Sequence, residues 1–215
     1  MPEIVISEFM DEAAIREAFA GRDVLYDPQL VDDAARLLDA VRDARALIVR
    51  NRTQVRGSLL DAAVKLEVVG RLGVGLDNID VAACTARGVA VYPASGANDL
   101  AVAEYVITAA LVLLRRAWFA SGRVAAGEWP RTALMGREIA GKRLGLVGYG
   151  SIARVTAGMA RGLGMSVAAC DPLLPADHPA WATAERQTLP DLLRGSDVVS
   201  LHVPLTETTR NMLDA

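Results

Sequence analysis

Cysteine and aromatic residues are scarce in this chain of 215 residues, and neither sign of charge is in marked excess. The two cysteines, Cys84 and Cys170, lie far apart within apolar segments, so we expect buried free thiols in a reducing compartment and no disulfide framework. A formal net charge of -3, without a cluster of basic residues, argues against a nucleic-acid partner.

Long hydrophobic runs are absent as well. The longest, residues 105–114, contains Thr108 and is shorter than the roughly 20 residues that cross a bilayer. The N-terminal segment has no basic leader, and acidic residues such as Glu3 and Glu8 interrupt any apolar core. We therefore expect a cytoplasmic protein with no signal peptide and no membrane partner. The hydrophobic content of 52% is enough for a packed globular core.

Short β-rich runs alternate with segments of helical spacing along the chain. This alternation predicts an α/β fold with parallel sheets, because parallel neighbours need a helical crossover between them. We place a domain boundary near residues 93–98, which divides the chain into residues 1–97 and 98–215. The expected strands are residues 3–7, 24–26, 46–49, 66–69, 89–92, 143–147, 166–170 and 197–201.

Several helix ends are marked by residues typical of caps. We expect Ser58 to cap the helix that follows it, and Asp80 to cap a helix that ends at Gly88. Residues 99–120 read as one long, mostly apolar helix that joins the two domains and contributes a homodimer contact. A loop over residues 122–141 then leads into the second domain.

A glycine-rich turn follows the apolar strand at residues 143–147. Gly148, Gly150 and Ala153 form the pattern G-x-G-x-x-A, which is typical of a dinucleotide-binding turn between a strand and a helix. The next strand ends in Asp171, about 20 residues further on, where an acid accepts hydrogen bonds from a ribose. A carboxylate there repels a 2′-phosphate, so the pattern predicts NAD as cofactor. A purely structural glycine turn is the alternative.

Four segments resemble the D-isomer-specific 2-hydroxyacid dehydrogenases. They are residues 68–80 (VVGRLGVGLDNID), 97–104 (ANDLAVAE), 148–153 (GYGSIA) and 201–206 (LHVPLT). Within the family, the asparagine at position 78 resembles the phosphoglycerate dehydrogenase-like branch. The resemblance implies a flavodoxin-like substrate domain at residues 1–97 and a Rossmann-type, doubly wound NAD-binding domain at residues 98–215. It also implies hydride transfer between nicotinamide and C2 of a small anionic 2-hydroxy or 2-oxo acid.

The resemblance also implies site residues. Backbone N–H groups in the glycine-rich loop would hold the substrate carboxylate, helped by an arginine after the third strand, Arg52 in preference to Arg50. The implied substrate-binding residues are Arg52, Val74, Gly75, Leu76 and Asn98. The implied cofactor-binding residues are Gly148, Tyr149, Gly150, Ser151, Ile152, Asp171, His202, Val203, Pro204 and Thr209. We expect no metal site.

The family's acid–base histidine, its partner glutamate and its orienting arginine lie, in relatives, beyond the segment that matches residues 201–206. We therefore assign no catalytic residue in this chain, and we do not assign His202 as the acid–base group. We expect the C-terminal strands of the second sheet to be missing, and the chain alone to bind NAD weakly without catalysis. A non-catalytic NAD(H)-binding fragment or corepressor-like module is the alternative function. Phosphoglycerate, hydroxypyruvate and sulfolactate remain open as substrates.

Overall fold

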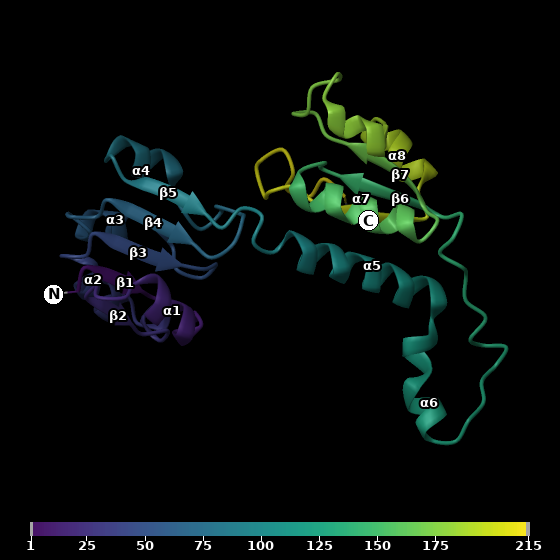
Figure 1. Ribbon diagram of the computed structural model, residues 1–215, viewed down its shortest axis with the longest axis horizontal. Coiled ribbons are helices and arrows are strands. Elements are labelled where there is room, and N and C mark those ends of the chain that lie inside the picture. The colour runs from purple at the N-terminus through teal and green to yellow at the C-terminus, as the bar shows by residue number, and fades with distance from the viewer. Residues whose placement is uncertain (1, 214–215) are drawn as a thin grey trace. The chain divides into compact units, whose positions relative to one another are not determined.

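The chain forms two compact units, and the division falls between Ala97 and Asn98. The computed structural model describes residues 2–213. Each unit contains one parallel β-sheet with helices packed on it, so the α/β class that the sequence predicts is confirmed (Figure 1). No helix in the described part of the chain is long and apolar enough to cross a bilayer.

The sheet of the first unit has the strand order β2-β1-β3-β4-β5, with every neighbouring pair parallel. This is the flavodoxin-like order, as expected from the sequence. The strands are β1 (Ile4–Ile6), β2 (Val24–Tyr26), β3 (Ala46–Val49), β4 (Val68–Arg71) and β5 (Ala90–Pro93). The helices are α1 (Glu12–Ala18), α2 (Ala34–Val41), α3 (Ser58–Ala62) and α4 (Val81–Ala86), with a 3₁₀ turn η1 (Leu30–Asp32).

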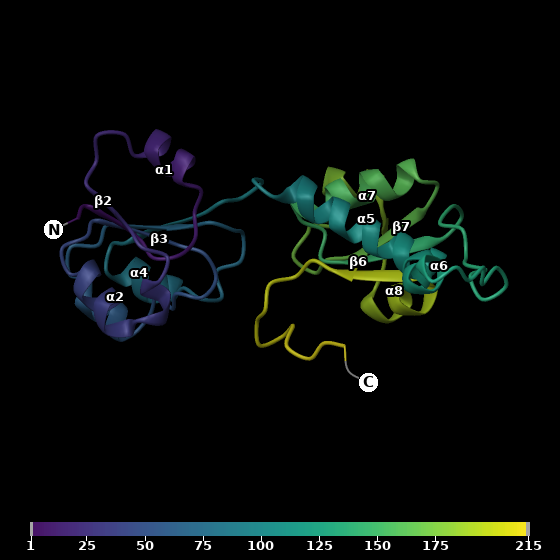
Figure 2. The same cartoon turned by 90° about the horizontal axis from the view of Figure 1, so that it is seen from below.

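Both faces of this sheet are covered, and that explains its continuous apolar strands. Successive side chains of β1 point to opposite faces, so Ile4 and Ile6 pack with Ile15 of α1 while Val5 joins the larger core on the other side. Figure 2 shows α1 on one side of the sheet and α2 and α4 on the other. The carboxyl ends of β3 and β4 lie side by side, because Val49 pairs with Arg71.

One predicted helix cap of this unit is confirmed and one is wrong. Asp80 accepts a hydrogen bond of 2.8 Å from Ala83 N and begins α4, and Gly88 closes that helix with a φ of 72°. Ser58 is not a cap: it is the first residue of α3, and Gly57 occupies the cap position with a φ of 51°. The chain enters α3 through a left-handed residue, which favours glycine.

The sheet of the second unit has the parallel order β8-β7-β6-β9. When the four strands are numbered in chain order, the order is 3-2-1-4, which is the arrangement around the first strand of a Rossmann fold. The predicted Rossmann-type sheet is therefore confirmed. The strands are β6 (Arg143–Val147), β7 (Ser166–Cys170), β8 (Glu185–Arg186) and β9 (Val198–Leu201). The helices are α5 (Asp99–Arg115), α6 (Ser121–Ala125), α7 (Ser151–Gly162) and α8 (Leu189–Gly195), with 3₁₀ turns η2 (Ala117–Ala120) and η3 (Pro179–Thr183).

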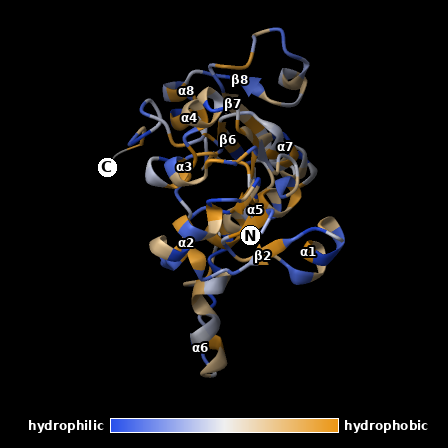
Figure 3. Ribbon diagram, turned by 90° about the vertical axis from the view of Figure 1, so that its left-hand side faces the viewer, coloured by the Kyte–Doolittle hydropathy of each residue, from blue (hydrophilic) through white to orange (hydrophobic). Residues whose placement is uncertain are grey.

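Helices cover both faces of this sheet, with α5 and α7 on one side and α8 on the other (Figure 2). Helix α7 packs closely against the core of this unit, because the side chains of Ala153, Ala157 and Ala160 are small and fully buried. Ile107 of α5 belongs to the same core, and Figure 3 shows hydrophobic residues along α5. The strand expected at residues 197–201 is present as β9, and it pairs with β6.

The long helix expected at residues 99–120 ends five residues early, at Arg115. Arg116 is left-handed with a φ of 57°, and the chain continues through η2 into α6. The carbonyl of Leu114, which would continue the helix, instead accepts a hydrogen bond of 2.8 Å from Arg137 N. Gly136 passes so close that a Cβ there would lie 2.5 Å from Arg115 O. A later segment therefore packs against the end of the helix.

Candidate functional site

The turn between β6 and α7 depends on glycine at position 148. Gly148 has a φ of 88°, and a Cβ there would lie 2.6 Å from the carbonyl oxygen of His202, at the end of β9. Any larger residue would therefore meet both a strained backbone and a steric clash. The two adjoining strand ends are consequently brought together around the turn, and His202 N donates to Val147 O over 2.7 Å.

The second glycine of the turn leaves the start of α7 open. Gly150 is the N-cap residue, no side chain caps the helix, and a Cβ at this position would meet nothing within 4 Å. The amides of the first turn, which includes Ser151 and Ile152, and the positive end of the helix dipole are suited to a phosphate. Ala153 is fully buried where the helix packs on the sheet, so a small residue is required there.

Asp171, at the end of β7, is fixed beside this turn. Its Oδ2 accepts a hydrogen bond of 2.8 Å from Tyr149 N, and its Oδ1 accepts one of 2.9 Å from Leu173 N. A carboxylate has about four acceptor positions, so it can still accept hydrogen bonds from a diol. These features fit a dinucleotide: an open helix N-terminus for its pyrophosphate and an oriented acid for its adenosine ribose.

The side chain of Tyr149 has a structural role that the sequence analysis missed. It is fully buried, its ring stacks on Trp181 with centroids 5.4 Å apart, and its hydroxyl lies 2.7 Å from that of Thr183. Tyr149 therefore serves the site through its backbone N–H alone. The aromatic residue inside the glycine turn is the sequence signal that could have indicated this packing.

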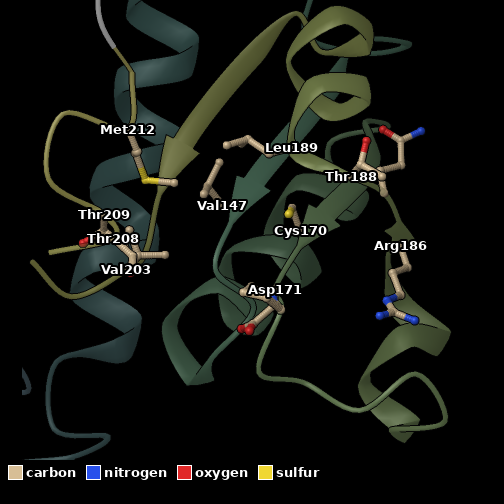
Figure 4. Close-up of a pocket in the computed structure, with 12 residues that line it drawn as sticks. Val147, Cys170, Asp171, Arg186, Thr188, Leu189, Val203, Thr208, Thr209 and Met212 are labelled. Atoms are coloured by element: carbon tan, nitrogen blue, oxygen red, sulfur yellow. The ribbon is translucent and has the colours of Figure 1, made fainter. Parts of the chain in front are cut away.

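A cavity of about 610 Å³ lies next to Asp171, a volume within the range of small-molecule sites. Three of the predicted cofactor residues, Asp171, Val203 and Thr209, line it, whereas His202 and Pro204 do not. Figure 4 shows the carboxylate of Asp171 between the segment of Val203 and Thr209 and the strand that carries Arg186. The complete lining is Val147, Cys170, Asp171, Pro172, Arg186, Gln187, Thr188, Leu189, Val203, Thr208, Thr209 and Met212.

Two further residues of this cavity shape its chemistry. Burial and the neighbouring Asp171 raise the pKa of the Cys170 thiol, so this thiol is uncharged at neutral pH. The guanidinium of Arg186 lies 5.7 Å from the ring centroid of Trp181.

His202 does not line the cavity, and burial lowers the pKa of its imidazole. Its Nε2 lies 3.1 Å from Ser200 Oγ. A half-buried, neutral histidine that contacts a serine of the preceding strand is consistent with a structural role.

In the first unit, the glycine-rich loop after β4 lies under an arginine that the sequence analysis missed. A Cβ at Gly73 would lie 1.7 Å from Arg71 Nη1, so the guanidinium occupies the space that a side chain there would need. Arg71 Nε is buried without a partner, and Arg71 forms no ion pair within residues 2–213. The loop with Val74, Gly75 and Leu76 thus has a free cation beside it.

The two arginines after β3 differ in their surroundings. Arg52 pairs with Asp32 through both terminal nitrogens, whereas the guanidinium of Arg50 lies 5.9 Å from the ring centroid of Phe9. Asn78 links this segment to the glycine-rich loop, because its buried amide donates to Thr53 O over 2.8 Å. Arg50 therefore has more freedom than Arg52 to bind an anion.

The remaining expectations concern Asn98 and metals. Asn98 precedes α5 at the N-cap position, but its side chain makes no capping hydrogen bond. Within residues 2–213 no group of three or more histidine, cysteine, aspartate or glutamate side chains is arranged to hold a metal ion.

Sequence comparison identifies the family. Residues 107–215 match the NAD-binding domain of the D-isomer specific 2-hydroxyacid dehydrogenases. The chain is 55% identical to an (S)-sulfolactate dehydrogenase of Chromohalobacter salexigens, over all of this chain and 70% of that protein. It is 40% identical to a D-3-phosphoglycerate dehydrogenase of Mycobacterium leprae, over 85% of this chain and 34% of that protein.

Solved structures agree. A protein of Thermus thermophilus matches with a TM-score of 0.85 and 29% identity, over 97% of this chain and 67% of that chain. The NAD⁺-bound 3-phosphoglycerate dehydrogenase of Entamoeba histolytica matches with a TM-score of 0.78 and 26% identity, over 97% of this chain and 64% of that chain. The chain therefore belongs to the D-isomer specific 2-hydroxyacid dehydrogenases, a family of oxidoreductases, and its cofactor is NAD.

Proposed function

We propose that the protein to which these residues belong transfers a hydride between NAD and C2 of a small 2-hydroxy acid that carries a second anionic group. The observation that carries this proposal is the pair Arg50 and Arg71, two arginines without an acidic partner within residues 2–213, at the adjoining ends of β3 and β4. In the oxidative direction the acid loses a hydride to NAD⁺ and a proton from its hydroxyl, giving the 2-oxo acid and NADH.

On the cofactor side, the amides at the start of α7, around Gly148, Gly150, Ser151 and Ile152, would hold the pyrophosphate. Asp171, oriented by Tyr149 N, would accept the hydroxyls of the adenosine ribose. The segment His202, Val203, Pro204 and Thr209 would border the bound nucleotide. Because the carboxylate of Asp171 repels a 2′-phosphate, we expect NADH to bind far more tightly than NADPH, although Arg186 lines the same cavity.

On the substrate side, the backbone N–H groups of Val74, Gly75 and Leu76 would hold the C1 carboxylate. Arg50 and Arg71 would bind the second anion, and Arg52 would support them from its ion pair with Asp32. Asn98 is a further proposed polar contact for the substrate. The relative named (S)-sulfolactate dehydrogenase favours a sulfonate as the second anion over the phosphate of phosphoglycerate.

A homodimer through residues 99–120 and a cytoplasmic location complete the proposal. Large apolar side chains on this segment are exposed, including Tyr105 at 75% and Trp118 at 71%. Contiguous exposed apolar surface is typical of subunit contacts. Sedimentation of the wild-type chain and of a Tyr105→Glu variant tests the dimer: a mass that falls to one chain in the variant supports it, and a monomeric wild type contradicts it.

The non-catalytic alternative is less favoured, because relatives with 55% and 40% identity to this chain are named as dehydrogenases. Turnover distinguishes the two. We expect NADH formation when (S)-sulfolactate and NAD⁺ are added to a protein that contains these residues together with the region that relatives have beyond them. NAD binding without turnover of any 2-hydroxy acid in that protein would support the binding module.

A further inference from the structure

Glu8 is a buried acid with an unusual set of donors. It follows β1 closely and is only 5% exposed. Its Oε1 accepts hydrogen bonds from Arg50 N at 2.9 Å and Thr53 N at 3.0 Å. Its Oε2 accepts from Arg52 N at 3.1 Å and Asn51 N at 3.3 Å. All four consecutive amides of residues 50–53 therefore converge on a single carboxylate.

Converging backbone amides form a concavity that binds anions. Here the anion is internal, so this concavity is closed to a substrate, and Glu8 instead determines the shape of the segment. Burial alone would raise the pKa of Glu8, but the hydrogen bonds from Thr53, Arg50 and Arg52 outweigh it and lower the pKa. The carboxylate is thus ionised at neutral pH, when its hydrogen bonds are strongest.

The residues on either side of Glu8 contact the same segment. Ser7 Oγ lies 2.9 Å from Thr53 Oγ1, and both residues are buried. The ring of Phe9 lies beneath the guanidinium of Arg50, 5.9 Å from its centre. Residues 7–9 therefore hold both the backbone of residues 50–53 and the side chain of Arg50.

We propose that Glu8 is a positioning residue, which fixes the backbone of residues 50–53 so that Arg50 is presented in one orientation to the second anion of the substrate. The inference rests on the proposed function, because it assigns a purpose to the orientation of Arg50. Glu8 itself does not contact the substrate and acts only through residues 50–53. Removal of the carboxylate therefore weakens recognition of the second anion and leaves recognition of the cofactor unchanged.

The test compares Glu8→Gln, Glu8→Asp and Glu12→Gln. An amide at position 8 directs an NH₂ group at two backbone donors, whereas aspartate keeps the charge with a shorter reach. Glu12, whose side chain is 71% exposed on α1, is the matched control for the loss of one charge. For each folded variant, calorimetry measures the affinity for (S)-sulfolactate, for lactate, which lacks the second anion, and for NADH. Hydrogen exchange reports on the amides of residues 50–53.

We expect Glu8→Gln to weaken (S)-sulfolactate binding roughly tenfold, the scale of a lost charge-assisted hydrogen bond. Lactate and NADH binding should stay as in the wild type, exchange at residues 50–53 should accelerate, and Glu8→Asp should recover part of the loss. Equal losses for (S)-sulfolactate and lactate, or no loss for either, would overturn the inference. Failure of the proposed function is seen separately, as a wild-type chain that does not bind (S)-sulfolactate more tightly than lactate.

Discussion

The carboxylate of Asp171 accepts a hydrogen bond of 2.8 Å from the backbone N–H of Tyr149. The glycine turn after β6 and the acid at the end of β7 are thus joined directly, although they are separated in sequence by the whole of α7 and β7. Because Tyr149 is fixed in turn by its stacking on Trp181, the acid has a defined orientation before any nucleotide binds. Such preorganisation lowers the entropic cost of binding.

Replacing Asp171 tests that link. We expect Asp171→Ala to weaken NADH binding roughly tenfold or more, since hydrogen bonds to a charged group are lost. The affinities for NADH and NADPH should also become more similar in this variant, because the carboxylate that repels a 2′-phosphate is removed. Fluorescence titration measures both affinities, with Asp177→Ala, an exposed acid in the following loop, as control. Unchanged NADH affinity in Asp171→Ala would contradict the assigned role.

We expect glycine at position 148 to be required for the stability of the fold as well as for binding of the cofactor. Gly148→Ala adds a Cβ at a φ of 88° and 2.6 Å from His202 O, so we expect a loss of about 2–4 kcal/mol in the free energy of unfolding. The control is Gly158→Ala, within α7, where a Cβ meets nothing within 4 Å. That change should stabilise by about 0.5–1 kcal/mol. Denaturant unfolding measures both variants, and similar effects from the two would show that the turn tolerates a side chain.

The buried carboxylate of Glu8 predicts a pH dependence of stability. Its pKa is lowered in the folded chain, so its contribution is fully present above the unfolded value of about 4.3 and is lost as the pH falls through the folded value. The wild type should therefore have a larger free energy of unfolding than Glu8→Gln at pH 7. This difference in free energy should shrink as the pH falls below the unfolded pKa and towards the folded pKa of Glu8. Urea unfolding at a series of pH values measures it; a difference that stays constant with pH would contradict the prediction.

The two arginines after β3 should differ in their effect on substrate affinity. Arg50 has no acidic partner within residues 2–213, whereas Arg52 is held by Asp32. We expect Arg50→Ala to weaken (S)-sulfolactate binding roughly tenfold and Arg52→Ala to weaken it less. Each variant is the control for the other, since both remove one positive charge from one segment. A larger loss of affinity for Arg52→Ala would contradict this prediction and would favour Arg52 over Arg50 as the substrate-binding arginine, as the sequence analysis expects.

The sequence predicts well those features that depend on local pattern. The order of strands and crossovers follows from alternating apolar runs and helical spacing, and the turn at Gly148 follows from the need for a tight strand-to-helix connection. Asp80 is predictable as a cap because its side chain bonds an amide three residues along the same chain. Strand limits shift by one or two residues, as with β4, which begins at Val68.

Features that depend on distant contacts were not predictable in this way. Helix α5 ends at Arg115, and the carbonyl of Leu114 in its last turn is paired with Arg137, a residue of a distant segment. The burial of Glu8 depends on four backbone amides of a later segment, which donate hydrogen bonds to its carboxylate. The place of Arg71 over Gly73 likewise depends on the path of the loop.

Titration of the wild-type chain with NADH and with NADPH, followed by nicotinamide fluorescence, tests the central claim most directly. The open start of α7 and the oriented carboxylate of Asp171 predict saturable binding of NADH and little or none of NADPH. A folded chain that binds neither nucleotide, or that prefers NADPH, would contradict the assignment of this turn as a working NAD site.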